Sequence, residues 1–353
     1  MTQNRYIVVN ATALDRSGAL SILRQFIENV PSDKYQWLIF TPDNVDLSSD
    51  KENVRLEPIP GVKPMLKRLF WDAFGLNKWL KKHDIIPIAA ISLQNTGFRV
   101  TNKIPRFIYY HQPLPFYPNE WNPLDPIQRT FWFYKNIYPF FVRLFMNNET
   151  EIFVQLEFIK KGFISKFHHP KDKVSVFTPT VNSLFPENSD SGVTEKMTLI
   201  YPAMPHFYKN HKVIEEALKN TSRDVEIVFT IPSDDDRISD KRISKVGMQP
   251  QENIWKMYHS CDALLFPSYI ETFGLPLLEA AMTGMPIIAA DLPYAREVLD
   301  GYDGVTYVEY DNSIAWANAI NKLKKGERFT PVDISSRPSW PELFSAIVKE
   351  IDS

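Results

Sequence analysis

Short apolar runs alternate with amphipathic stretches along the whole chain. Many of the apolar runs are continuous, which is typical of strands that are buried on both faces of a parallel sheet. The stretches between them place apolar residues at helical spacing, so the pattern predicts doubly wound α/β domains. The predicted strands begin at Tyr6, Tyr35, Ile85, Arg106, Glu151, Lys173, Met197, Val225, Cys261, Met285 and Gly304. The predicted helices are SGALSILRQFIENV, HKVIEEALKN, NIWKMYHS, LPLLEAAMTG and SWPELFSAIVKEI.

A polar stretch near the middle of the chain, VNSLFPENSDSGVTEK from Val181, predicts a linker or long loop where a domain boundary is expected. We therefore predict a first domain over residues 1–170 and a second over residues 171–335. The closing helix, residues 336–353, begins at a proline-containing turn and is expected to pack back on the first domain.

Composition narrows the class of protein. The chain has 353 residues with a formal net charge of −2, so no overall field holds nucleic acid. Its single cysteine, Cys261, excludes an internal disulfide and indicates a reducing compartment; a buried, inert thiol is expected there. The first residues lack the features of a signal peptide, and no apolar run is long enough to span a bilayer. We expect a cytoplasmic protein.

The glycines exclude two common α/β classes. The chain has 12 glycines, and no two of them are separated by a single residue. A G-x-G dinucleotide fingerprint and a P-loop are both absent from the sequence, which argues against NAD-dependent dehydrogenases and P-loop kinases.

The segment LFPSYIETFGLPLLEAAMTGMPIIAAD, from Leu265, carries the most chemistry. Gly274 and Pro276 predict a turn and a helix start, and a helix N-terminus is a suitable site for a diphosphate. Glu279 near that end can accept hydrogen bonds from ribose hydroxyls, and Glu271 before the turn can reach a sugar. Two solvated carboxylates that flank a strand–helix connection are the alternative.

This segment resembles glycosyltransferase family 4, whose signature is a strand ending in FPS, then E-x-FG-x-P-x-x-E-A and a G-x-P before the next strand. The resemblance extends to MYHSCDALLFPS, PYAREVL and YPAMPHFYKNHKVIEEAL. It implies the GT-B fold, in which two facing Rossmann-like doubly wound domains enclose a cleft, and transfer with retention of configuration.

The resemblance also implies a donor site. Glu279 would bind the nucleotide ribose, Glu271 the donor sugar, and Lys209 the diphosphate leaving group. The other donor-binding positions would be Asn210, Phe273, Gly274 and Leu275. Many members of the family have an arginine some six residues before the lysine, and this chain has none there. Either Lys209 acts with His206 or His211, or another cation enters from elsewhere.

The first half offers three more candidates. Gly18, after the first strand, gives either a close backbone approach to the donor or only a turn. The strand ends LQNT and HQPLPFY resemble the branch of the family found in bacterial surface-polysaccharide synthesis. Ligands gather at the carboxyl ends of strands in open α/β sheets, so Asn95 and His111 are candidates. The resemblance places His111 beside the reacting sugar.

Two aromatic and basic stretches, MLKRLFWDAFGLNKWL from Met65 and FWFYKNIYPFFVRLFM from Phe131, predict amphipathic core helices. A surface that rests on the inner face of a membrane, with Lys67, Arg68, Phe70 and Trp71 near the lipid, is the alternative. We interpret SDDDR, from Ser233, as a solvated loop, and we expect neither a metal nor another cofactor.

Together these features predict a retaining glycosyltransferase that moves a hexose-type sugar from a nucleotide-diphosphate sugar to a glycan acceptor, carried on a polyprenyl lipid, in O-antigen or capsule synthesis. The residues expected to carry the reaction are His111, Lys209 and Glu271. A GT-B sugar-nucleotide epimerase and a non-catalytic sugar-nucleotide-binding subunit are the alternatives.

Overall fold

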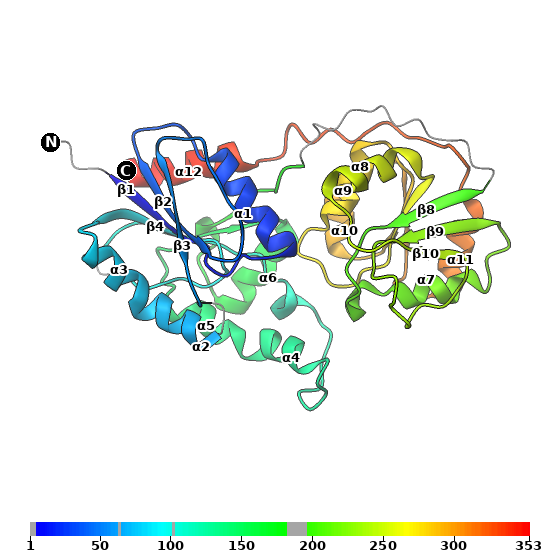
Figure 1. Ribbon diagram of the computed structural model, residues 1–353, viewed down its shortest axis with the longest axis horizontal. Helices are drawn as coiled ribbons and strands as arrows, with labels where there is room; N and C mark the ends of the chain where they lie inside the picture. Colours follow the sequence, from blue (N-terminus) through cyan, green and yellow to red (C-terminus); the bar gives the residue numbers. More distant parts are fainter. Residues whose placement is uncertain (1–4, 63–64, 101–102, 182–195) are drawn as a thin grey trace. The chain divides into compact units, whose positions relative to one another are not determined.

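The computed structural model describes residues 5–62, 65–100, 103–181 and 196–353, which form two compact units (Figure 1). The first comprises Met1–Thr180 and Arg337–Ser353, and the second comprises Val181–Ser336. The strand predicted from Lys173 pairs with the last strand before it in the first unit. The first unit therefore continues past residue 170, beyond the predicted boundary.

The first unit is built on a seven-stranded parallel sheet with the order β3-β2-β1-β4-β5-β6-β7. This order reverses direction between β1 and β4, which is the topological switch point of a Rossmann-like sheet. The strands are β1 (Tyr6–Asn10), β2 (Gln36–Pro42), β3 (Val54–Ile59), β4 (Pro87–Ser92), β5 (Arg106–Tyr109), β6 (Glu151–Val154) and β7 (Val174–Val176).

Helices cover both faces of this sheet because alternate residues of the central strands point to opposite sides. Ile7 and Val9 pack with Phe26 on one face, whereas Val8 packs with Trp71 on the other. The helical segments are α1 (Ser17–Asn29), α2 (Met65–Phe70), the π-helical turn η1 (Trp71–Gly75), α3 (Leu76–Lys82), η2 (Leu114–Phe116), α4 (Arg129–Asn136), α5 (Tyr138–Leu144), α6 (Glu157–Phe167), η3 (Lys171–Lys173) and α12 (Trp340–Asp352).

The closing helix α12 belongs to the first unit and lies beside α1 (Figure 1). A capping box between Ser339 and Glu342 fixes its start. Trp340 is buried between the helices, and its indole Nε1 donates to Gln25 Oε1 at 2.9 Å. A buried indole N–H needs such a partner, so this contact fixes how the helix packs.

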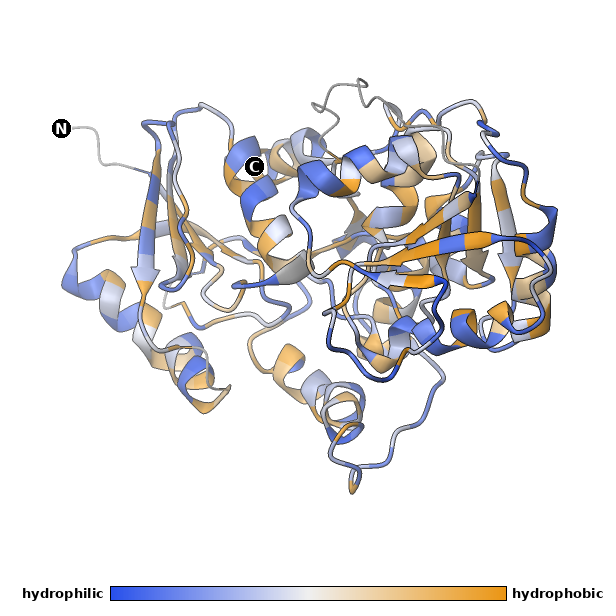
Figure 2. Ribbon diagram, turned by 45° about the vertical axis from the view of Figure 1, so that its right-hand side comes forward, coloured by the Kyte–Doolittle hydropathy of each residue, from blue (hydrophilic) through white to orange (hydrophobic). Residues whose placement is uncertain are grey.

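The second unit repeats the same plan with a six-stranded parallel sheet of order β10-β9-β8-β11-β12-β13, and its switch point lies between β8 and β11. Hydrophobic strands form its centre (Figure 2). The strands are β8 (Met197–Tyr201), β9 (Val225–Phe229), β10 (Ile243–Lys245), β11 (Ala263–Phe266), β12 (Ile287–Ala290) and β13 (Val305–Val308). The helical segments are η4 (Phe207–Lys209), α7 (His211–Leu218), α8 (Gln251–Ser260), α9 (Leu275–Met282), α10 (Pro293–Val298) and α11 (Ser313–Lys322).

The predicted fold class, two Rossmann-like α/β domains, is confirmed. Every strand predicted from an apolar run is present, but the sequence pattern missed the edge strands β3 and β10. Each has a single neighbour and carries charged residues, so neither forms a continuous apolar run. The predicted linker lies almost wholly outside the described residues. Cys261 is buried, and burial raises the pKa of its thiol to about 12, as expected of an inert thiol.

Candidate functional site

Two predicted donor-binding residues meet at the switch point of the second unit. Lys209 ends η4, which follows β8, and Glu271 follows the neighbouring strand β11. The Lys209 Nζ donates to Glu271 Oε1, and the two side chains are only 16% and 13% exposed. Open α/β sheets bind their ligands at this edge. The structure therefore brings two residues that lie 62 positions apart in the sequence together as an ion pair.

Asn210 holds the loop that carries Lys209. Its backbone is left-handed, with φ of 58°, directly before α7. Its side-chain Nδ2 donates to the carbonyl oxygen of Tyr310 at 2.6 Å and to that of Pro267 at 3.4 Å. The amide therefore ties together the loops that follow β8, β11 and β13, and its contacts in this structure position the site.

The turn before α9 is built around Gly274. Its φ of 88° is a left-handed conformation, and a Cβ there would lie 3.3 Å from Leu277 and 3.4 Å from Tyr294. Phe273 is buried and anchors the turn, and Leu275 begins the helix. The first amide N–H groups of a helix have no partner within it, so this turn offers an anion-binding end.

Glu279 is buried in the middle of α9, with 8% of its surface exposed. Its Oε1 accepts a hydrogen bond from Gln251 Nε2 at 2.7 Å, and its Oε2 accepts one from the Tyr258 hydroxyl at 2.8 Å. Burial raises the pKa of this carboxyl, and the two hydrogen bonds oppose the shift. Glu279 is thus not the solvated surface carboxylate of the alternative interpretation.

Neither histidine near Lys209 supplies a second positive charge at neutral pH. Burial, followed by the charge of Lys209, lowers the pKa of His211 to about 4. The pKa of His206 is also lowered, by burial and then by the charges of Lys209 and Arg237. Both imidazoles therefore favour the neutral form at neutral pH in this structure, and the two histidine alternatives remain predictions.

Arg237 brings a cation to the same edge of the sheet. It lies in the loop after β9, which is the neighbour of β8, and its charge acts on both His206 and His211. Asp235 holds the guanidinium, with Arg237 Nε donating to Asp235 Oδ1 at 2.8 Å. The described residues contain no cluster of three metal-ligating side chains. The segment SDDDR is an exposed loop, as predicted, but sequence reasoning did not single out Arg237 within it.

In the first unit, the ends of β4 and β5 bring Asn95 and His111 together. Asn95 has a left-handed φ of 69°, and its Oδ1 accepts a hydrogen bond from the backbone N–H of His111 at 2.6 Å. The His111 Nε2 lies 2.9 Å from the carbonyl oxygen of Leu93, so this nitrogen carries the proton. Burial lowers the pKa of His111 to about 4, which makes it a neutral imidazole at pH 7.

Gly18 lies in the first turn of α1 and is exposed. A Cβ at this position would have no atom within 4 Å, so the fold itself does not require a glycine here.

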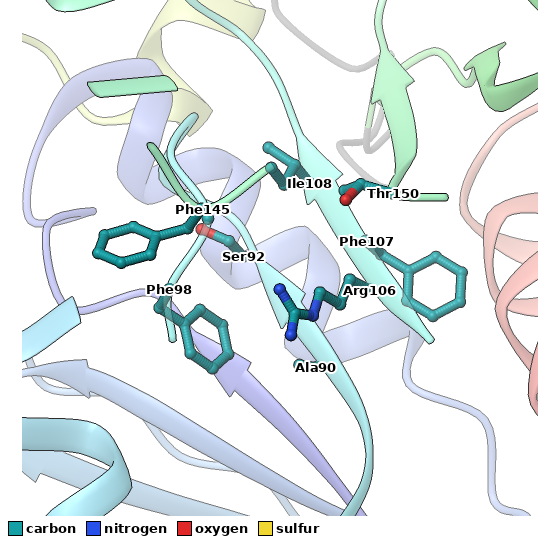
Figure 3. A pocket seen from close by; sticks show the side chains of 9 residues that line it. Ala90, Ser92, Phe98, Arg106, Phe107, Ile108, Phe145 and Thr150 are labelled. Carbon is teal, nitrogen blue, oxygen red and sulfur yellow. The ribbon is translucent and has the colours of Figure 1, made fainter. Parts of the chain in front are cut away.

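Sequence reasoning missed a buried polar cluster beside Asn95, formed by Asn10, Asp72 and Gln94 at the switch point between β1 and β4. A nearby cavity of about 10 Å³, lined by Ser92, Phe98 and Phe145 among others (Figure 3), has room for one water and none for a sugar.

Comparisons with known proteins show what the chain is similar to in sequence and in fold. Residues 237–336 match the family model of Glycosyl transferases group 1. The chain is 38% identical over 85 residues to D-inositol 3-phosphate glycosyltransferase of Corynebacterium diphtheriae, over 23% of this chain and 19% of that protein. It is 36% identical over 69 residues to the O-antigen chain mannosyltransferase RfbU of Salmonella typhimurium, over 20% of this chain and 19% of that protein. The matches thus span about a fifth of these relatives.

Solved structures match over nearly the full length. Sucrose-phosphate synthase of Thermosynechococcus elongatus superposes with a TM-score of 0.68 at 14% identity, covering 99% of this chain and 94% of that one. Anabaena HepE, in complex with UDP and glucose, gives a TM-score of 0.65 at 14% identity, covering 98% and 99%. The second unit is therefore similar in sequence to Glycosyl transferases group 1, and the whole chain is similar in fold to glycosyltransferases of the GT-B class.

Proposed function

We propose that this protein is a retaining glycosyltransferase that transfers a hexose-type sugar from a nucleotide-diphosphate sugar to the glycan acceptor of a bacterial surface polysaccharide. The observation that carries the proposal is the Lys209–Glu271 pair at the switch point, next to the N-terminal end of α9. The O-antigen relative RfbU and the UDP and glucose bound to HepE support the substrate class.

The second unit holds the donor in this proposal. The first turn of α9 and Lys209 receive the diphosphate, and Arg237 supplies the second cation. Glu271, held beside Lys209, accepts hydrogen bonds from the donor sugar, and Glu279 accepts them from the ribose. Negative charge grows on the diphosphate as the glycosidic bond breaks, so cations fixed at that point stabilise the transition state more than the ground state.

The first unit supplies His111 and Asn95 to the reacting sugar. A neutral imidazole places a hydrogen-bonding nitrogen without bringing a positive charge to a centre of oxocarbenium character. Retention then follows a front-face route, in which the departing phosphate oxygen takes the proton of the acceptor hydroxyl. Catalysis rests on electrostatic stabilisation and positioning.

Donor binding and product analysis test the proposal against an epimerase and a non-catalytic subunit. We expect nucleotide diphosphates and their sugars to raise the thermal unfolding temperature, since a ligand at 100 times its Kd stabilises the native state by about 2.7 kcal/mol. Transfer to a glycan acceptor should proceed unchanged in EDTA. Epimerised donor formed without acceptor would instead identify an epimerase, and binding without any product a non-catalytic subunit.

We further propose that the first unit rests on an anionic membrane that presents the polyprenyl-linked acceptor. Large apolar side chains are exposed on α2 and η1, among them Leu66 at 81% and Phe70 at 66%. The neighbouring α5 adds Phe140 at 65%. Exposed Lys67 lies beside a groove of about 450 Å³ lined by Leu66 and Phe70. Apolar side chains beside a cation suit the lipid interface.

Arg68 and Trp71, which were also expected near the lipid, turn their side chains into the unit instead. The Arg68 Nη2 donates to Gln94 O at 2.6 Å and to Thr96 Oγ1 at 2.8 Å inside the unit, and Trp71 is 9% exposed. No described helix is both long and apolar enough to cross a bilayer.

Replacing Leu66 and Phe70 with serine should therefore weaken binding to liposomes that contain anionic lipid by at least about tenfold, because burying one such side chain contributes about 1.5–3 kcal/mol. Co-sedimentation at low salt measures the effect. Serine at Met248 and Ile314, which are exposed in the second unit, serves as the matched control. A wild-type protein that ignores anionic liposomes would contradict membrane contact and leave the proposed reaction intact.

A further inference from the structure

A buried carboxylate lies at the switch point of the first unit. Asp72 is 1% exposed, and its Oδ1 accepts hydrogen bonds from Asn10 Nδ2 at 2.8 Å and from Gln94 Nε2 at 3.0 Å. Its Oδ2 has no hydrogen-bond partner among the described residues, and Arg68 Nε lies 3.8 Å away. Burying a charge is costly unless it is well paired, so a stable fold alone does not call for this carboxylate.

The π-helical turn η1 places this side chain. In this turn the carbonyl oxygen of Asp72 accepts from the backbone N–H of Arg99 at 2.8 Å. A Cβ at Gly75 would lie 2.7 Å from the ring of Trp71, so only glycine fits the turn as it stands. Single π-helical turns within α-helices occur frequently at functional sites.

Asp72 reaches both loops that leave the switch point. Gln94 donates to Asp72 through its Nε2, and its Oε1 accepts from the backbone N–H of Ala13 at 3.1 Å. Ala13 lies in the loop after β1 that leads to Gly18 and α1. One carboxylate therefore fixes a side chain that joins the loop after β1 to the loop after β4.

The loop after β4 holds a conformation that must be stabilised. Asn95 has a left-handed backbone, which asparagine tolerates better than most residues other than glycine but still at a cost in free energy. Arg68, aligned by Asp72, donates to the Gln94 carbonyl and to Thr96 on either side of it. The Asn95 Oδ1 in turn accepts a hydrogen bond from the backbone N–H of His111. The chain of contacts therefore runs from Asp72 to His111.

We propose that Asp72 is a positioning residue that, through Gln94 and Arg68, fixes the loop leading to Gly18 and the loops carrying Asn95 and His111 in the geometry needed for sugar transfer. This inference rests on the proposed function. Misplacement of reacting groups by about 1 Å can slow a reaction about 100-fold, so the effect belongs in kcat more than in the KM for the donor.

The Asp72→Asn variant tests the role of the charge, because its Oδ1 can keep both amide contacts while its Nδ2 turns a donor toward Arg68. We expect kcat to fall at least about tenfold, with donor KM within about twofold of wild type. Amide hydrogen exchange in residues 93–96 should also become faster. Asp262→Asn is the matched control, since Asp262 is a buried aspartate of the second unit that accepts two backbone N–H groups.

The pH profile separates positioning from general stability. Burial raises the pKa of Asp72 to about 6, so wild-type kcat should fall as the pH drops below about 6, and Asp72→Asn should lack this change. Asp72 faces the charge of Arg68, and the titratable groups around this Arg68–Asp72 pair are Tyr134, Tyr138 and His111. The pKa values of His111, about 4, and of Tyr134, raised above its ordinary value, lie outside this window.

Folding stability should respond in the opposite direction. A raised carboxyl pKa means that the folded state holds the proton more tightly, so the free energy of unfolding falls as the pH rises from about 4 through 6. Asp72→Asn should flatten that fall relative to wild type. A variant that keeps wild-type kcat, pH profile and exchange rates would overturn the inference. A wild-type protein that transfers no sugar would overturn the proposed function instead, while exchange would still report on the loops.

Discussion

Replacing Lys209 with alanine should lower kcat by about 10²–10³-fold and change the donor KM much less. Removing one preorganised group that stabilises transition-state charge has an effect of this size in other enzymes. The lysine is fixed by Glu271 at the switch point, so it needs no reorganisation when charge develops on the diphosphate. Steady-state kinetics at saturating donor measure the change.

The effect of losing the ion pair has to be separated from the loss of a catalytic cation, because Lys209→Ala leaves Glu271 without its partner. A double variant, Lys209→Ala with Glu271→Gln, removes that unpaired carboxylate. If the loss of rate came from the stranded charge, the double variant would recover to the rate of Glu271→Gln alone; if Lys209 acts on the leaving group, the double variant stays slower than Glu271→Gln. Lys212→Ala is the control, since Lys212 is exposed on α7. Near-wild-type turnover in a folded Lys209→Ala protein would exclude leaving-group stabilisation.

Exchanging Glu279 for glutamine should weaken donor binding by at least about tenfold without weakening the fold. Hydrogen bonds to a charged acceptor contribute about 1.5–3 kcal/mol, and about 1.4 kcal/mol corresponds to tenfold in Kd. Glutamine keeps the shape and retains an acceptor for Tyr258 or Gln251. Calorimetric titration with the nucleotide diphosphate gives the change in Kd.

Stability supplies the second measurement on the same variant. Burial raises the pKa of Glu279, so the free energy of unfolding falls as the pH rises from the ordinary range of a carboxyl through the raised value. Glutamine has no such dependence, and at pH 7 the variant should be at least as stable as wild type. Glu252→Gln, on the exposed side of α8, is the control. An unchanged donor Kd would remove Glu279 from the site.

The sequence predicted most of the fold because its central strands are buried on both faces. Runs such as those of β1, β8 and β11 are therefore mostly apolar, and this pattern can be recognised in the local sequence. The edge strands β3 and β10 have no continuous apolar run, and the sequence pattern therefore did not predict them. The strands β6 and β7 were both predicted, but the sequence did not show that they pair, so the predicted domain boundary fell before β7.

Some features of the candidate site were likewise predictable from the sequence and others were not. The turn at Gly274 was predictable because its left-handed backbone, proline and helix start follow one another along the chain. The orientation of the Arg68 side chain was not predictable, because a basic residue in an aromatic stretch can point outward or inward. Only packing against Gln94 and Tyr138 decides this, and it turns Arg68 into the unit.

The sequence by itself thus determined the two Rossmann-like sheets, the motif around Glu271 and Glu279, and the strand ends that carry Asn95 and His111. Each is encoded in residues close together along the chain. The tertiary structure alone decided which distant groups share an environment. It paired Lys209 with Glu271, made His206 and His211 neutral, brought Arg237 to the edge of β8, and buried Asp72 between Asn10 and Gln94. Protonation and charge depend on burial and on neighbours brought together by folding, and hydrophobic periodicity does not record those neighbours.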